Sequence, residues 1–162
     1  MTTLTNIPFD QLSIHQQAHY SKVVTEQDVQ LFASLSGDAN PIHLDESYAQ
    51  TTQFKQRIAH GMLTGAVVSA AIAMKLPGPG TIYSGQSLRF KRPVMLGDSI
   101  TVTLTVLEKH ESKPRVKLQC EVHNQHNLLV ADGEAEVLAP TEQQTLTLAA
   151  LPEVRMTPPS DS

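Results

Sequence analysis

The chain has 162 residues, with 12 Lys and Arg against 16 Asp and Glu, so its length fits one domain and its net charge is −4. This mild acidity argues against a general nucleic-acid-binding protein, which would carry a basic patch or stripe. The single cysteine, Cys120, excludes an internal disulfide. No apolar run reaches the roughly 18 residues of a membrane span, and the first basic residue, Lys22, comes too late for a secretory or transit peptide. We therefore expect a cytoplasmic protein without a membrane span.

Both ends of the chain are predicted to be peripheral. Residues 1–17 are polar and weakly patterned, whereas residues 140–162 are rich in Pro, Thr and Gln. We predict an N-terminal flank over residues 1–17, one domain over residues 18–139 and a Pro-rich tail over residues 140–162. The pattern assigns no role to the tail.

The first helical pattern of the domain follows Thr25. Thr25 with Asp28 three positions later is a variant of the capping box. Apolar residues then recur at helical spacing: Val29, Phe32 and Ala33. Gly37 ends this helix, because glycine readily takes a left-handed conformation. A loop over residues 38–43 is expected next, and then a short helix over residues 45–51 that Asp45 caps.

Residues 61–76 form a longer helical segment that is apolar nearly all round, with Thr64, Ser69 and Lys75 as the clearly polar exceptions. A helix of this kind must be buried on several sides. At 1.5 Å per residue it is about 24 Å long, enough to run the width of a small domain. The sequence Pro-Gly-Pro-Gly at 77–80 ends it.

Beyond residue 80 the apolar residues recur at every second position. Runs over residues 100–106, 116–122 and 131–137 alternate apolar and polar side chains, with turn-forming residues between them. Together with strands at 81–90 and near 18–24, they predict an antiparallel sheet with one buried face. The predicted fold class is α+β, with the sheet curled around the long helix. The exposed edge of such a sheet favours dimerisation.

Asp38 and His43 are the first candidate catalytic residues. They lie five positions apart, with the rigid Asn40-Pro41 step between them, so the loop can direct a carboxylate and an imidazole at one point. Such a pair could hold and deprotonate a water molecule, since histidine titrates near neutrality. The alternative is that Asp38 caps a turn and His43 packs against it.

The start of the long helix, His60-Gly61-Met62, is the second candidate. A helix N-terminus offers unpaired N–H groups and partial positive charge. Glycine there would let a ligand carbonyl approach closely, so that an enolate oxygen could be stabilised as in an oxyanion hole. The alternative is that Gly61 merely allows close packing between helix and sheet.

Together these segments resemble the hydratase-2 motif of the MaoC-like, (R)-specific enoyl-CoA hydratases. The likeness rests on Ser-Gly-Asp-Ala-Asn-Pro-Ile-His at 36–43, and it continues through Arg-Ile-Ala-His-Gly-Met-Leu at 57–63, residues 76–80, residues 83–94 and Gly97-Asp98. It covers most of residues 20–138 and is strongest for the short hydratases that supply polyhydroxyalkanoate synthesis. The resemblance implies a hot-dog fold, in which an antiparallel sheet wraps one central helix.

The resemblance also implies a reaction, the reversible hydration of a trans-2-enoyl-CoA to an (R)-3-hydroxyacyl-CoA. Asp38 and His43 match the catalytic pair, and Gly61 matches the position whose N–H polarises the thioester carbonyl. Asn40 would fix the loop and hydrogen-bond near the substrate, and His60 and Met62 would contact the substrate beside Gly61. No metal or redox cofactor is implied, because the thioester itself acidifies Cα. A homodimer with the sites near its interface is implied as well.

Four basic residues are candidates for contacts with the phosphates of coenzyme A: Arg57, Arg89, Lys91 and Arg92. A charge run at a strand end is more commonly a solvated face. Two other functions share the fold. A hot-dog thioesterase would place a carboxylate on the central helix without the 36–43 loop, and a non-catalytic acyl-CoA or acyl-carrier binding module would lack turnover.

Overall fold

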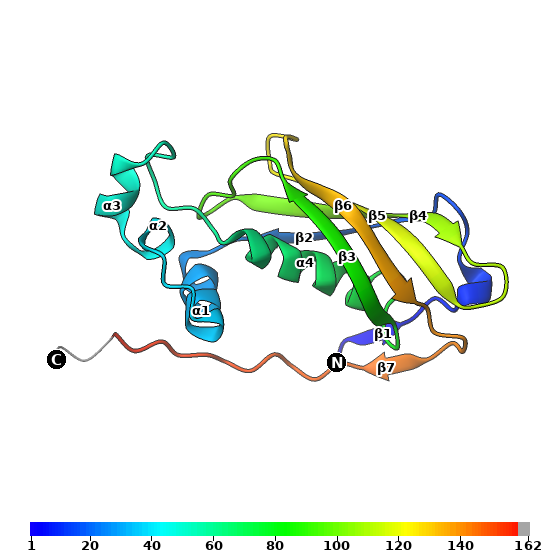
Figure 1. Ribbon diagram of the computed structural model, residues 1–162. Coiled ribbons are helices and arrows are strands. Elements are labelled where there is room, and N and C mark those ends of the chain that lie inside the picture. Colours follow the sequence, from blue (N-terminus) through cyan, green and yellow to red (C-terminus); the bar gives the residue numbers. More distant parts are fainter. Residues whose placement is uncertain (159–162) are drawn as a thin grey trace.

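The predicted strands form one antiparallel sheet of five strands, in the order β2-β4-β5-β6-β3 (Figure 1). The structure is a computed structural model that describes residues 1–158, so the last four residues of the predicted tail lie outside it. The strands are β2 (Gln17–Val23), β3 (Ile82–Phe90), β4 (Ser99–Lys109), β5 (Arg115–His123) and β6 (Leu129–Leu138). Each contains or closely matches a predicted run, so the alternating pattern located the sheet correctly.

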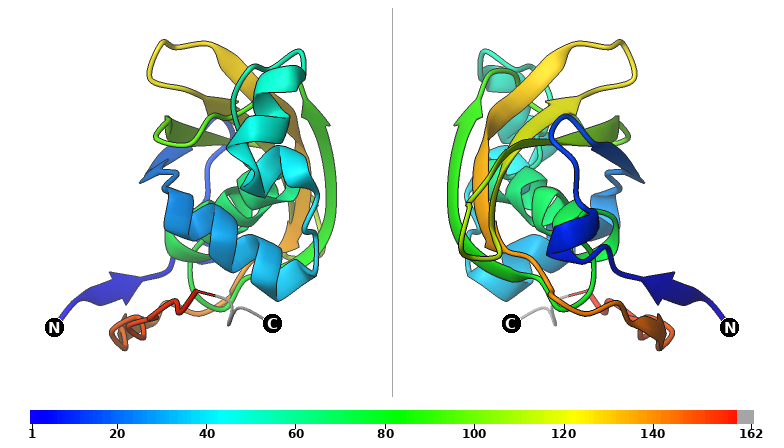
Figure 2. Two further views of the ribbon diagram at one scale, coloured as in Figure 1. Left: turned by 90° about the vertical axis from the view of Figure 1, so that its left-hand side faces the viewer. Right: turned by 90° about the vertical axis from the view of Figure 1, so that its right-hand side faces the viewer.

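The long apolar helix, α4 (Gly61–Met74), lies on the concave face of this sheet, which curls around it (Figures 1 and 2). Its buried side chains include Leu63, Val67, Val68, Ala71 and Ile72. They meet the inward-facing residues of the strands, among them the fully buried Val102, Leu104, Val116 and Leu118. The predicted α+β architecture is therefore confirmed.

Cys120 belongs to the same buried layer. Its thiol is fully buried on β5, and this burial raises its pKa to about 11. The side chain therefore acts as a small apolar core residue, as the alternation predicts.

Within residues 1–158, none of the helices has the length and hydropathy needed to cross a bilayer. The cytoplasmic location stays a prediction.

Two of the three helices before α4 follow their predicted caps. The helix α1 (Glu26–Ser36) begins at a complete capping box between Thr25 and Asp28 and ends at Gly37, whose φ is 79°. Burial works to raise the pKa of Asp28, but hydrogen bonds from Thr25 and Lys22 outweigh it and hold that pKa below its usual value. The helix α3 (Glu46–Thr51) is capped by the Asp45 side chain.

The segment after α1 differs from the prediction. Residues 38–43 are predicted to be a loop, but Pro41–Leu44 form a short helix, α2, with Asn40 as its N-cap. The Asn40 side chain accepts a hydrogen bond from the Ile42 N–H, and Pro41 occupies the first helical position. Asn before Pro is a favourable helix start, so the signal is present in the sequence.

The two flanks are paired with each other. Strand β1 (Thr3–Thr5) pairs antiparallel with β7 (Thr145–Thr147), and a 3-10 turn, η1 (Phe9–Gln11), follows β1. Asn6, only 2% exposed, holds the junction. Its Nδ2 donates to the carbonyls of Pro79 and Glu142, and its Oδ1 accepts from the Gln144 N–H. One side chain thus ties both flanks to the loop after α4.

Replacing this clamp should weaken the fold measurably. We expect Asn6→Ala to lower the free energy of unfolding by about 2 kcal/mol, because three backbone groups lose their partner in a buried place. Urea unfolding measures the change, with Gln143→Ala, an exposed amide on the same segment, as the matched control. Equal stability of the two variants would show that the flanks are not held by Asn6.

Candidate active site

Asp38 is held in place by the end of α1 and the start of α2. Gly37 turns the chain out of α1, and the Asp38 N–H donates to Ser36 Oγ at 3.2 Å. The Asp38 carboxylate accepts from the Asn40 N–H through Oδ1, also at 3.2 Å. Its side chain is 52% exposed. The loop therefore fixes one carboxylate oxygen and leaves the other, Oδ2, accessible.

His43 faces that second oxygen from α2. The side chain is nearly buried, and its Nδ1 lies 2.7 Å from the Ile58 carbonyl. A carbonyl oxygen can only accept, so Nδ1 carries a proton, and in the neutral imidazole Nε2 then keeps its lone pair. This Nε2 lies 4.0 Å from Asp38 Oδ2. The structure thus brings a hydrogen-bond-accepting nitrogen and a carboxylate oxygen together across a gap that is too long for a direct bond.

His60 lies directly behind this pair. It is 3% exposed, and its ring stacks on that of His43 with centroids 3.8 Å apart and an interplanar angle of 26°. Its Nε2 is 3.0 Å from the backbone carbonyl of Asp38. The centroid of the Phe32 ring lies 4.9 Å from that of the His60 ring. His60, a predicted substrate contact, therefore also touches both Asp38 and His43.

Gly61, the next residue, begins α4. His60 is the N-cap of this helix but makes no side-chain cap to its N–H groups, and no other cap is present in the described part of the chain. The N–H groups of Gly61 and Met62 therefore remain open to a ligand, whereas the Leu63 N–H donates to the His60 carbonyl at 3.1 Å. A Cβ on Gly61 would come within 3.2 Å of the Phe90 ring, so glycine keeps this approach clear.

A cavity of about 350 Å³ adjoins this helix start, and two of the predicted basic residues line it. Lys91 and Arg92 line it together with His60, Gly61 and Phe90. Lys91 also lies 4.0 Å from Asp132, and Arg92 donates to the Leu129 carbonyl at 2.8 Å. Both cations therefore stand next to the open N-terminus of α4.

The other predicted contact residues are placed differently. Arg57 pairs with Glu26 at 2.9 Å and with Glu46 at 3.2 Å, which joins α1 to α3. Burial works to lower the pKa of Arg57, but these two pairs raise it. Arg89 borders a different cavity, on β3 and β6, and Met62 is 62% exposed on α4. These side chains are not brought together with Asp38 and His43.

Asp38, His43 and His60 could also hold a cation. One donor atom each from Asp38, His43 and His60 lies within 4.8 Å of the others. Only one carboxylate contributes, and the His60 Nε2 already meets a carbonyl. The predicted independence from metal stays a prediction.

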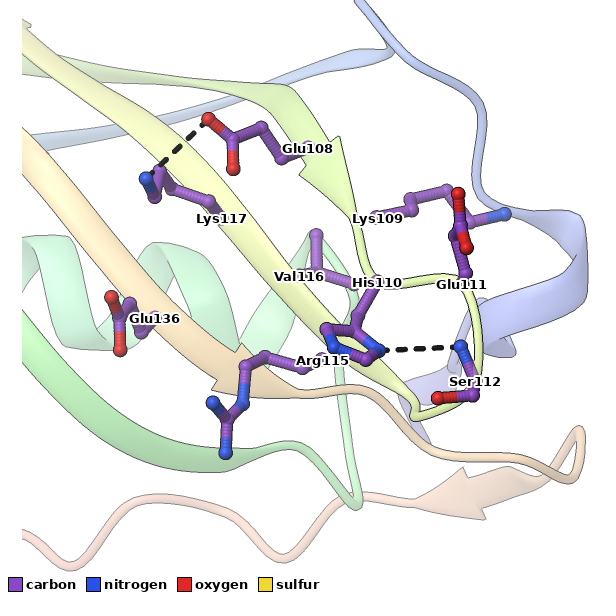
Figure 3. Close-up of a pocket in the computed structure, with 9 residues that line it drawn as sticks. All are labelled: Glu108, Lys109, His110, Glu111, Ser112, Arg115, Val116, Lys117 and Glu136. Atoms are coloured by element: carbon purple, nitrogen blue, oxygen red, sulfur yellow. Dashed lines mark hydrogen bonds and ion pairs between the residues drawn. The ribbon is translucent and has the colours of Figure 1, made fainter.

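A further hollow lies where β4 ends and β5 begins (Figure 3), at the other end of these strands from α2 (Figure 1). Its volume is about 430 Å³, and its walls come from the end of β4, the following turn and the start of β5. Charges of both signs border it, with Glu108 and Lys117 paired at 3.4 Å. It contains none of the predicted site residues, so it does not compete with the 38–43 loop as a reaction site.

Two supporting contacts have no visible sign in the sequence. The Ile58 carbonyl, which sets the His43 proton, is a backbone group that any residue could supply. Phe32 is predicted only as part of the apolar stripe of α1, yet its ring also contacts His60.

The chain is similar to known proteins over most of its length. The MaoC-like domain family matches residues 11–127. An (R)-specific enoyl-CoA hydratase of Rhodospirillum rubrum is 46% identical over 134 residues, which is 82% of this chain and 91% of the relative. An (R)-specific enoyl-CoA hydratase of Aeromonas caviae is 43% identical over 129 residues, 80% of this chain and 96% of the relative.

A solved structure extends the likeness into the flanks. The unliganded R-hydratase PhaJ1 of Pseudomonas aeruginosa superimposes with a TM-score of 0.93 and 55% identity, covering 96% of this chain and 100% of that protein. Its match includes most of the tail to which the sequence pattern assigned no role. The arrangement of one helix wrapped by the sheet is the hot-dog fold. By its sequence, its fold and its 36–43 loop, the chain belongs to the MaoC-like family.

Proposed function

We propose that the chain is an (R)-specific enoyl-CoA hydratase, which adds water reversibly to a trans-2-enoyl-CoA to give an (R)-3-hydroxyacyl-CoA. One observation carries the proposal: Asp38 Oδ2 and His43 Nε2 face each other at 4.0 Å, beside the open N-terminus of α4. The Rhodospirillum and Aeromonas relatives are (R)-specific enoyl-CoA hydratases, which supports the same reaction.

The gap between the two side chains fits one water molecule. A water between them can lie about 2.8 Å from both atoms, which is a normal hydrogen-bond length. Both atoms accept hydrogen bonds, so the water donates both its protons and turns its lone pairs outward. This orientation suits attack on Cβ of an enoyl thioester.

The reaction then balances within the site. The water oxygen bonds to Cβ, the water loses one proton to the Asp38–His43 pair, and the pair returns a proton to Cα. Because the two groups are close, which of them carries the proton at each moment is a property of the pair. The Gly61 N–H at the start of α4 stabilises the thioester oxygen while it carries enolate charge.

Substrate recognition is proposed to use the cavity beside Gly61. Lys91 and Arg92, which line it, can meet the phosphates of coenzyme A. Asn40 acts through the loop by capping α2. Met62, on the exposed side of α4, is a proposed contact for the acyl group. No cofactor is assigned, since the thioester itself acidifies Cα.

The mixing of crotonyl-CoA with the purified protein tests the function. Loss of the conjugated enoyl absorbance, unchanged after dialysis against EDTA, is the expected result. A loss that EDTA abolishes and a divalent cation restores would contradict the cofactor proposal. Release of free thiol would instead indicate a thioesterase, and binding without turnover would indicate a binding module. The same assay with short, medium and long enoyl chains defines the preferred substrate.

We also propose a homodimer formed through β3 and α4. The edge strand β3 exposes apolar side chains, with Ile82 at 61% and Phe90 at 50% exposure. The neighbouring helix exposes an apolar stripe of Met62, Ala66 and Ala73. An edge strand with such neighbours is a template for pairing. A second copy of the chain on this face would lie close to Gly61, because the Phe90 ring of β3 lies 3.2 Å from where a Gly61 Cβ would be.

A charge in the α4 stripe should disrupt this dimer. We expect Ala66→Glu to change the mass in solution from twice 17.7 kDa to 17.7 kDa, because an unpaired carboxylate is costly to bury. Light scattering after size-exclusion chromatography measures it. The matched control is Leu151→Glu, at a position 93% exposed in the tail, which should stay dimeric. A dimeric Ala66→Glu protein would place the interface elsewhere.

A further inference from the structure

We propose that His60 is a positioning residue that fixes Asp38 and His43 relative to the start of α4. The inference rests on the proposed hydratase function and deepens it. The His60 side chain contacts both members of the pair, and its own backbone leads into Gly61. The three groups assigned to the reaction therefore share one support.

The first contact acts on Asp38. The Asp38 carbonyl oxygen accepts from His60 Nε2 at 3.0 Å, so Nε2 carries the His60 proton. The Asp38 carboxylate is separately held by the Asn40 N–H. Asp38 is thus fixed at its main chain by His60 and at its side chain by Asn40. Loss of the His60 donor removes the bond that holds the Asp38 carbonyl, whereas the Asp38 N–H keeps its bond to Ser36 Oγ.

The second contact acts on His43. Its Nδ1 bond to the Ile58 carbonyl holds one edge of the ring, and rotation of the ring about its Cβ–Cγ bond would break that hydrogen bond. The stacked His60 ring, 3.8 Å away, covers one face and restricts this rotation. Rotation would move Nε2 away from Asp38 Oδ2 and change the gap in which the water is proposed to bind.

The remaining nitrogen of His60 distinguishes positioning from simple packing. Its Nδ1 is buried and has no hydrogen-bond partner within residues 1–158. A buried polar atom without a partner is unfavourable, and an apolar side chain of similar size would avoid it. Packing alone therefore does not favour histidine here. Histidine is favoured here because its Nε2–H donates to the Asp38 carbonyl and its flat ring stacks on His43.

Two variants separate these contributions. His60→Gln keeps an N–H donor but removes the ring, and His60→Leu removes both. In crotonyl-CoA hydration we expect kcat to fall in the order wild type, His60→Gln, His60→Leu, with a loss of about 10- to 100-fold for the leucine variant. KM should stay within about threefold of wild type, because His60 is only 3% exposed and offers little surface to a bound substrate. His126→Gln, at an exposed turn, is the matched control.

A spectroscopic measurement makes the test independent of turnover. In 15N-histidine NMR, wild-type His43 should show a single Nδ1–H tautomer, and the His60 variants should show mixed tautomers. If wild type lacks activity but the tautomer still depends on His60, the proposed function fails and the positioning role stands. If His60→Leu does not fold, His60→Gln alone decides. A kcat within about twofold of wild type with an unchanged tautomer overturns the proposal, and so does a rise in KM at constant kcat, which would make His60 a substrate contact.

Discussion

Asp38→Asn should lower kcat for enoyl-CoA hydration by about 10³-fold, and His43→Gln by a similar factor, with little change in KM. Asn keeps the size of Asp38 but cannot take a proton, and its amide can donate where the water needs an acceptor. Gln in place of His43 removes the Nε2 lone pair that lies 4.0 Å from the carboxylate. Steady-state kinetics with crotonyl-CoA measures both losses.

The double variant should be scarcely worse than either single variant, because the two groups act as a unit on one water molecule. Asp45→Asn supplies the matched control. It makes the same carboxylate-to-amide change two residues after His43, and Asn caps a helix such as α3 as well as Asp does. Retention of more than about a tenth of the wild-type kcat by Asp38→Asn would exclude Asp38 as the proton carrier.

Gly133→Ala should destabilise the protein by more than about 4 kcal/mol or release β3 from the sheet. A Cβ on Gly133 would lie 1.9 Å from the Ser87 carbonyl oxygen and 3.0 Å from Leu88 Cα. Both are backbone atoms of the paired strand β3 and cannot move aside separately. The added methyl group therefore forces β6 and β3 apart.

Gly85→Ala is the matched control on the same pair of strands. Its Cβ would meet the Glu136 Cβ at 3.7 Å, an ordinary contact, so its stability should change by less than about 1 kcal/mol. Urea unfolding measures both variants, and hydrogen exchange at the β3 amides reports release of the strand. Equal unfolding free energies would mean that the two backbones separate at little cost.

Local signals account for the elements that the sequence located well. The capping box at Thr25, the glycine at 37 and the strict alternation in β4 and β5 depend on neighbouring residues only. The apolar pattern extended α4 to residue 76, whereas the helix ends at Met74. Apolar character marks burial, and it continues through the buried Leu76 after helical geometry has ended.

Contacts between distant residues account for what the sequence did not supply. Strands β1 and β7 have three residues each, and their partners lie more than a hundred positions apart, so no local pattern announces the pairing. In the site, the motif identified Asp38, His43 and Gly61. The 4.0 Å gap between Asp38 and His43, the Nδ1–H bond of His43 and the stacking of His60 depend on how α2 packs against residues 58–60, just before α4.

The pairing of the flanks places the beginning of the chain beside its C-terminal segment. The Leu148 N–H donates to the Thr2 carbonyl at 2.9 Å, and Thr3 stands opposite Thr147. A short peptide linker could therefore join these two points covalently, with a new start and end opened at the exposed turn between β5 and β6. Such a circular permutant would retain every strand pairing of the sheet and would lose only the covalent connection between β5 and β6.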